Sequence, residues 1–380
     1  MDQWTRRKFF LTSLAGSALA GTTSLLRAPL SEANNSVPPL NPTAKRPVII
    51  SAANGVHALQ KGMDILKSGG DTLDAAVAAV TVVEDDPNDD SVGYGGLPNE
   101  DGVVELDASV MHGPTRRAGS VASVQRIKNV AHLAKTVMER TNHVMLVGDG
   151  ARKFAVDEGF EEMNLLTEHS RKIWLAWKAR TSFNWRPGID SPEWKAALAQ
   201  IFDNDPKQIA YAMEVINHPP TGTINCLALN EKGEISGTTT TSGLAWKIPG
   251  RVGDSPVIGA GVFVDGDVGG AGSTGKGEEN IKICGAHTIV ESMRKGAKPA
   301  DACLEALGRV VRNYNGDKQK LGTFQLSYYA LNKDGEYGAA SLWKSAHDPN
   351  KIAHFAVHDG SEARLEPCRN FYDEIGHEDD

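Results

Sequence analysis

The 380-residue sequence has few cysteines and no block of basic residues outside its N-terminus. Four cysteines are too few for a disulfide framework, and none of them forms the Cys-x-x-Cys pair typical of a structural zinc site. The net charge of −8 argues against nucleic acid as a partner. The composition, 40% hydrophobic and 23% charged, is that of an ordinary soluble globular protein and excludes disordered, collagen-like and coiled-coil chains.

The apolar stretch near the N-terminus, residues 9–26, is too short and too polar to span a bilayer, because glycine and serine dilute it. It follows the twin-arginine pattern of Arg6 and Arg7. We therefore predict that residues 1–33 are a twin-arginine signal peptide and that the mature protein is periplasmic, with no membrane contact once the signal is removed. An uncleaved N-terminal anchor is the alternative.

The texture of the sequence changes at residue 222. Residues 161–222 are rich in tryptophan (174, 177, 185 and 194) and end in His-Pro-Pro-Thr-Gly, which is incompatible with regular structure. The next residues, 223–230 and 234–241, are typical of two strands joined by a hairpin turn. Further patterns predict helices over 57–68, 75–83, 130–140, 151–158, 286–295 and 300–313, and strands over 48–51, 102–110, 324–331 and 352–357.

These helices and strands cluster by type and do not alternate regularly. Such an order favours an α+β protein, with helices layered around antiparallel sheets, over a doubly wound parallel sheet.

Cleavage of the bond between Gly222 and Thr223 would produce a catalytic nucleophile. If the bond between them were cut, Thr223 would have a hydroxyl and a free α-amine on the same residue. An α-amine with a pKa of about 8 can serve as general base for that hydroxyl, so the nucleophile needs no separate histidine. The alternative is an ordinary loop-to-strand boundary, where a glycine followed by threonine also occurs.

Three segments downstream strengthen this interpretation. The threonine run 238–241 supplies hydroxyls at the end of the partner strand. Arg251 and Asp254 place a cation and an anion three residues apart, and together they match the α-carboxylate and α-ammonium of an amino acid; a surface ion pair is the alternative. In the glycine-rich run 259–277, residues 273–277 can present backbone N–H groups to a developing oxyanion, whereas the alternative is a flexible loop.

Three other motifs do not support a cofactor. Residues 270–276 fit the spacing of a phosphate-binding loop, but Gly277 stands where magnesium needs a hydroxyl, and no strand is expected just before the motif. The acidic segment 84–90 lacks the spacing of a calcium loop, and His354 and His358 lie on a predicted strand without an adjacent glutamate. We therefore predict no cofactor and no metal, and we interpret Cys226 as a buried core residue.

Together these segments resemble the glycosylasparaginase (aspartylglucosaminidase) family of N-terminal-nucleophile hydrolases, which includes the plant-type asparaginases. The downstream resemblance is carried by Thr223-Ile224-Asn225, the threonine run, residues 249–256 and Thr274-Gly275-Lys276-Gly277. Upstream, residues 83–87, 91–96, 106–108, 119–122 and 143–151 also resemble that family. The similarity extends over roughly residues 46–368.

The resemblance implies a four-layer αββα sandwich made as a precursor, which cuts itself into an α chain (34–222) and a β chain (223–380) that together form one domain. It implies that two such units pair as a heterotetramer. It also implies roles for individual residues: Thr223 as nucleophile, Thr241 orienting its amine and hydroxyl, Arg251 and Asp254 binding the substrate's α-carboxylate and α-ammonium, and Thr274 and Gly275 forming the oxyanion hole.

The sequence departs from the glycosylasparaginase pattern at two places. Glycosylasparaginases usually have aspartate before the nucleophile, whereas plant-type asparaginases have glycine, as here at Gly222. The Asn-Thr-Trp of the first strand, whose tryptophan contacts substrate, is replaced by Ser51-Ala52-Ala53.

We therefore predict an amidohydrolase that cleaves the side-chain amide of N4-(β-N-acetylglucosaminyl)-L-asparagine or a related L-asparagine derivative through a β-aspartyl ester. The alternatives are an isoaspartyl peptidase or L-asparaginase of the same family and, from another class, an uncleaved binding protein.

Overall fold

The computed structural model describes residues 47–180, 191–220 and 222–376, all within one compact unit, Pro42–Asp380. The predicted signal peptide, residues 1–33, lies outside the described residues. Within the described residues, no helix combines the length and the apolar character that crossing a membrane requires.

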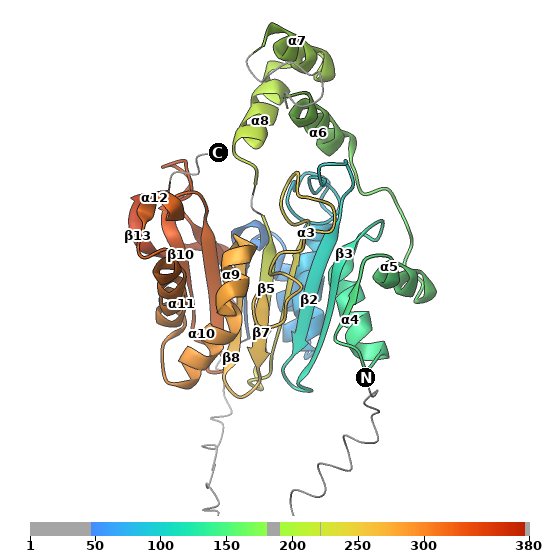
Figure 1. Cartoon of the computed structure of the whole chain (residues 1–380). Coiled ribbons are helices and arrows are strands. Elements are labelled where there is room, and N and C mark those ends of the chain that lie inside the picture. Colours follow the sequence, from blue (N-terminus) through green and yellow to red (C-terminus); the bar gives the residue numbers. More distant parts are fainter. Residues whose placement is uncertain (1–46, 181–190, 221, 377–380) are drawn as a thin grey trace, which may run out of the picture. The chain divides into compact units, whose positions relative to one another are not determined.

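The strands form two sheets (Figure 1), so the protein is of the mixed α+β class, as predicted. The larger sheet has the order β12 (Arg364–Pro367), β11 (His354–His358), β1 (Val48–Ala52), β5 (Ile224–Leu229), β6 (Ile235–Thr241), β2 (Leu106–His112), β3 (Arg117–Val124) and β4 (Met145–Val147). The smaller has the order β13 (Arg369–Ile375), β10 (Tyr337–Ser345), β9 (Leu326–Asn332), β8 (Gly269–Gly275) and β7 (Val262–Asp265). Neighbouring strands are antiparallel except β3 with β4 and β10 with β13.

Helices cover each sheet through an apolar cluster. The helices that pack against the larger sheet are α2 (Leu59–Lys67), α3 (Thr72–Glu84), α4 (Val130–Arg140) and α5 (Gly148–Asp157). The helices that pack against the smaller sheet are α10 (Gly285–Arg294) and α11 (Pro299–Asn313), next to the short α9 (Gly277–Ile283) and α12 (Lys318–Leu321). A third cluster contains side chains of both sheets, among them Leu227 of β5 and Tyr329 of β9.

A separate helical excursion precedes the predicted junction. It consists of α6 (Glu168–Arg180), α7 (Pro192–Ile201) and α8 (Pro206–Asn217), and it has its own apolar cluster around the buried Trp194. Helix α8 ends at Asn217, and the described residues of 218–223 belong to no helix or strand, as their proline content predicts.

Most of the predicted elements are present with shifted ends. The hairpin of β5 and β6 forms as expected, and Asp71 caps α3 by accepting from the backbone N–H groups of Leu73 and Asp74. Helix α3 is longer than predicted, and β2 begins at Leu106 and not at residue 102. Cys226 is buried, as expected.

The glycine-rich run 259–277 is not the flexible loop considered as an alternative, because the whole of β7 and β8 lies within it. The view that Gly269 belongs to no strand is likewise wrong, since β8 begins there. Glycine is needed because β8 lies against the larger sheet: a Cβ on Gly272 would lie 2.0 Å from Asn225 Nδ2.

Candidate active site

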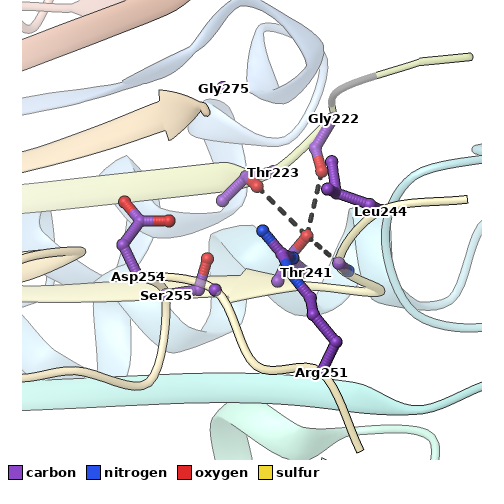
Figure 2. A pocket seen from close by; sticks show the side chains of 10 residues that line it. Gly222, Thr223, Thr241, Leu244, Arg251, Asp254, Ser255 and Gly275 are labelled. Carbon is purple, nitrogen blue, oxygen red and sulfur yellow. Dashed lines mark hydrogen bonds between the residues drawn. The ribbon is translucent and has the colours of Figure 1, made fainter. Parts of the chain in front are cut away.

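The hydroxyl of Thr241 joins Thr223 to the carbonyl of Gly222 (Figure 2). Thr223 Oγ1 donates to Thr241 Oγ1 at 3.1 Å, and Thr241 Oγ1 donates to the Gly222 carbonyl oxygen at 2.9 Å. The backbone N–H of Gly243 also donates to Thr241 Oγ1, at 3.0 Å. One donated and two accepted hydrogen bonds use the full capacity of a hydroxyl, so the position of Thr241 Oγ1 is fixed.

The hairpin explains why residues 18 apart in sequence meet. Ile224 of β5 pairs with Thr240 of β6, so Thr223, just before β5, comes opposite Thr241 at the end of β6. Thr223 is 8% exposed and Thr241 2%. The nucleophile predicted from sequence therefore lies in a nearly dry environment, where hydrogen bonds to its hydroxyl are not weakened by water.

The loop after α3 lies against the other side of the junction. An ideal Cβ built on Gly222 would lie 1.8 Å from Ser91 Oγ. Ser91 is itself held, because its hydroxyl donates to Asp89 Oδ1 at 2.5 Å and its carbonyl accepts from the backbone and hydroxyl of Ser242. The residue before Thr223 therefore has no room for a side chain unless this loop moves.

Arg251 and Asp254, which were predicted to bind the α-carboxylate and α-ammonium of the substrate, both lie in the loop between β6 and β7. Arg251 Nε and Nη2 donate to Glu278 Oε1 at 2.9 and 2.7 Å. Asp254 Oδ2 accepts from Ser273 Oγ at 2.5 Å and from Asn280 Nδ2 at 2.6 Å. Burial raises the pKa of Asp254, and these two hydrogen bonds oppose that rise only in part.

The two predicted oxyanion-hole residues have different surroundings. Gly275 lines the pocket with a left-handed backbone, φ 111°, and a Cβ there would lie 2.3 Å from the Gln325 carbonyl oxygen. The Thr274 hydroxyl is hydrogen-bonded to the Tyr329 hydroxyl at 2.8 Å. Thr274 therefore precedes a residue of the pocket wall, but its own hydroxyl is hydrogen-bonded to a side chain of β9.

These residues surround one small pocket. Its volume of about 10 Å³ is room for a single water molecule. The described residues that line it are Gly222, Thr223, Thr241, Gly243, Leu244, Arg251, Gly253, Asp254, Ser255 and Gly275. The structure thus brings together Gly222, Thr223, Thr241, Arg251, Asp254 and Gly275 of the sequence prediction.

Sequence reasoning missed Ser91, Ser255 and Glu278 as individual site residues. In the sequence Ser91 is only one residue of a block that resembles the family, and nothing in its spacing ties it to Gly222. Glu278 directly follows the Thr274–Gly277 segment, but its pairing with Arg251 depends on the start of α9, which local pattern does not locate.

The tryptophans of the excursion do not line the pocket in the described part of the chain. Trp194 is buried among α6–α8, and the ring of Trp177 stacks on that of Trp246 at 4.9 Å. Trp174 Nε1 donates to the Glu100 carbonyl at 3.2 Å. Trp185 lies outside the described residues. None of these three rings therefore contributes to the wall of this pocket.

Comparison with known proteins identifies the family of the chain. Residues 45–341 match the model of the asparaginase family, and the chain belongs to this family of N-terminal-nucleophile hydrolases. The predicted class of enzyme, a hydrolase of carbon–nitrogen amide bonds, is thereby confirmed.

Three relatives illustrate the range of the similarity. An N(4)-(beta-N-acetylglucosaminyl)-L-asparaginase of Elizabethkingia miricola is 42% identical over 325 residues, 85% of each chain. A protein of the same name from Mus musculus is 33% identical over 297 residues, 77% of this chain and 84% of the relative. A protein named "Probable isoaspartyl peptidase/L-asparaginase 3" from Arabidopsis thaliana is 32% identical over 310 residues, 78% of this chain and 84% of the relative.

Proposed function

We propose that the chain is a self-processing amidohydrolase whose nucleophile is Thr223. The observation that carries the proposal is the double role of Thr241, whose hydroxyl contacts both the Thr223 hydroxyl and the carbonyl of the bond to be cut. A donor on that carbonyl oxygen stabilises the negative charge that develops there when the carbonyl carbon is attacked.

The processing step converts an amide into an ester and then into two chains. Thr223 Oγ1 bonds to the carbonyl carbon of Gly222, the Gly222–Thr223 carbon–nitrogen bond breaks, and the hydroxyl proton ends on the Thr223 nitrogen. Water then hydrolyses the ester, which leaves a carboxylate on Gly222 and both a hydroxyl and a free α-amine on Thr223. Because Gly222 lines the pocket, withdrawal of the new chain end would enlarge a site that now holds about 10 Å³.

The same groups then act on an L-asparagine derivative. The Thr223 amine takes the proton of its hydroxyl, which attacks the side-chain amide carbonyl, and the leaving amine receives that proton. Gly275, with Thr274, donates to the oxyanion, while Arg251 and Asp254 bind the α-carboxylate and α-ammonium. Water hydrolyses the β-aspartyl ester and releases aspartate.

The preferred leaving group of the proposal is N-acetylglucosaminylamine, which the names of the Elizabethkingia and Mus relatives support. An isoaspartyl peptidase or L-asparaginase is the second candidate. It is favoured by the glycine at position 222, by the pocket without tryptophan among the described residues and by the name of the Arabidopsis relative. Release rates from glycosylated asparagine, a β-aspartyl dipeptide and free asparagine, measured side by side, separate the two.

The finer architecture is also part of the proposal. Three of the apolar clusters, two between helices and sheets and one shared by both sheets, support a four-layer αββα sandwich. In this sandwich the α chain is residues 34–222 and the β chain is residues 223–380.

Residues 1–33 are proposed to direct export to the periplasm through the twin-arginine route. Replacing Arg6 and Arg7 by lysine should retain the protein in the cytoplasm.

The proposed assembly is a heterotetramer of two α and two β chains. It is supported by exposed apolar side chains at the end of the larger sheet, where β4 is the last strand: Val144, Met145 and Val147 are 49%, 41% and 56% exposed. A second copy would cover this edge. Light scattering on the purified protein measures the assembly directly.

The decisive experiment is the intact mass of the wild type beside Thr223→Ala. The proposal expects two wild-type chains, one beginning at Thr223, and a single chain for the variant. A wild type that stays whole after long incubation and does not hydrolyse any of the three substrates would instead be a binding protein.

A further inference from the structure

The short helix α9 contacts both halves of the proposed amino-acid recognition site. Glu278, in its first turn, accepts two hydrogen bonds from Arg251. Asn280, two residues on, donates to Asp254. The helix starts close to the recognition loop because residue 277 is glycine: a Cβ there would lie 2.7 Å from Asp254 Oδ1 and 2.8 Å from the Asp254 nitrogen.

The pairing with Glu278 fixes which edge of the Arg251 guanidinium faces the pocket. Nε and Nη2 are both bound to Glu278 Oε1. Nη1 lies nearest to the two glycines of the pocket wall, since Cβ atoms built on Gly253 and Gly243 would lie 3.0 and 3.5 Å from it. The Arg251 side chain is only 17% exposed. A long side chain held in this way loses little further freedom when a ligand binds.

The carboxylate of Glu278 is suited to this role. Burial favours its neutral form, but the charge and hydrogen bonds of Arg251 outweigh burial and lower the pKa of Glu278, so it is ionised at neutral pH. Its second oxygen, Oε2, is buried and has no hydrogen-bond partner among the described residues. Arg251 is thus the polar group that fixes this carboxylate, and the carboxylate in turn fixes Arg251.

Asp254 is held by a fully buried network. Asn280 is 0% exposed, its Nδ2 donates to Asp254 Oδ2, and its Oδ1 accepts from the Tyr328 hydroxyl at 2.8 Å. Ser273 donates to the same Asp254 oxygen. With Oδ2 occupied twice, Oδ1 is the oxygen of Asp254 left to receive a ligand's ammonium group.

We propose that Glu278 and Asn280 are positioning residues, and that α9 sets the separation between the cation and the anion that bind the substrate's α-carboxylate and α-ammonium. The inference rests on the proposed function. Because Glu278 neutralises Arg251, the α-carboxylate is recognised by placed donors more than by excess positive charge. The enzyme should therefore discriminate between a free α-carboxylate and the corresponding carboxamide through these donors, because the carboxamide presents an NH2 group, which cannot accept from Arg251, where the carboxylate presents a second acceptor oxygen.

The test uses the full-length processed enzyme and two chromogenic probes. One probe is the β-(para-nitroanilide) of L-aspartate, and the other is the same anilide with its α-carboxylate converted to a carboxamide. Glu278→Gln keeps the length of the side chain and removes its charge. Glu279→Gln is the matched control, since the carboxylate of Glu279 pairs with Lys282.

For Glu278→Gln we expect KM for the free-acid probe to rise about tenfold with kcat within twofold, and kcat/KM for the carboxamide to stay within twofold. Self-cleavage, followed by intact mass, should be unaffected in both variants. Glu279→Gln should match the wild type on both probes. A general loss of folding would instead reduce turnover of both probes equally.

The possible outcomes distinguish the positioning role of Glu278 from the proposed function. A wild type that cleaves itself and hydrolyses the free acid, beside a Glu278→Gln variant whose KM is unchanged or lower, overturns the positioning role alone. A KM that falls would mean that Glu278 competes with the substrate for Arg251. A wild type that neither cleaves itself nor hydrolyses the anilide overturns the proposed function and this inference with it.

Discussion

Ser91 occupies the space that any side chain on Gly222 would need, since a Cβ at position 222 would lie 1.8 Å from Ser91 Oγ and 1.9 Å from Ser91 Cβ. The glycine at this position is therefore matched to the loop beside it. The clash involves the Cβ of Ser91 as well as its hydroxyl, which Asp89 holds at 2.5 Å, so rotation of the serine side chain cannot relieve it.

Gly222→Ala should therefore slow self-cleavage strongly, because the added methyl group pushes the carbonyl of residue 222 away from Thr241 Oγ1. The rate of appearance of the two chains by intact mass is the measurement. The double variant Gly222→Ala/Ser91→Gly removes the obstacle and should recover much of the rate. If the single variant cleaves as fast as the wild type, the loop is adaptable and the steric argument is wrong.

Thr241→Val should reduce the rate of self-cleavage by about 100-fold or more, the usual cost of losing one oxyanion donor. Valine keeps the shape of threonine and removes only the hydroxyl that donates to Gly222. Time courses of cleavage from the freshly purified precursor give the ratio.

The control for that variant is Thr238→Val on the same strand, whose hydroxyl donates to the Ser109 carbonyl at 3.0 Å. It should lower the free energy of unfolding by about 1–3 kcal/mol and leave the cleavage rate unchanged. Equal slowing of cleavage by both variants would point to strand distortion and not to a role of the Thr241 hydroxyl.

On acidification, substrate binding should weaken at a higher pH than it would if Asp254 had the pKa of an ordinary aspartate. Burial raises the pKa of Asp254, and only its ionised form can pair with an ammonium group, so KM should rise as pH falls through that raised pKa. Measuring KM between about pH 4 and pH 7 tests this, beside Asp254→Asn, whose KM should be high and nearly independent of pH in this range. A wild-type KM that is flat over the whole range contradicts the prediction.

The buried Glu84 should make stability depend on pH. Burial raises its pKa from 4.5 to about 7, against the hydrogen bonds that its Oε1 accepts from Thr240 and Ala131. Between these two values the folded state holds a proton that the unfolded state has lost, so the stability contributed by Glu84 is greatest below pH 4.5 and is lost as pH rises to about 7. The loss attributable to this group is about 3 kcal/mol.

Urea unfolding of the single-chain Thr223→Ala protein at several pH values measures that loss. Introducing Glu84→Gln into the same background should remove this part of the pH dependence, because glutamine cannot ionise. Parallel curves for the two proteins would show that Glu84 titrates normally.

Local pattern predicted the elements that depend on neighbouring residues. The hairpin that places Thr223 opposite Thr241, and the Asp71 cap of α3, follow from turn and cap residues read along the chain. The hairpin pattern placed the threonine run 238–241 at the end of the partner strand, the family resemblance made Thr241 the expected partner of Thr223, and the structure gives that contact.

Contacts between segments that are distant in sequence could not be predicted from local pattern. The approach of Ser91 to Gly222 joins the loop after α3 to the end of the helical excursion, and the strand character of Gly269–Gly275 depends on its packing against β5. A glycine-rich stretch has no local strand preference, so its structure is decided by what lies beside it.

The strand order of the larger sheet determines what happens to the two chains after the proposed cleavage. Strand β1, from the part before Gly222, lies between β11 and β5 from the part after it, and β6 pairs with β2 across the same divide. The two products of cleavage would be woven through one sheet and would stay together without any covalent link. Once unfolded, however, they would have to find each other by diffusion, so folding would become bimolecular and dilute enzyme would not recover. The single-chain precursor is then the only form that folds alone, and cleavage makes its folding a one-way event.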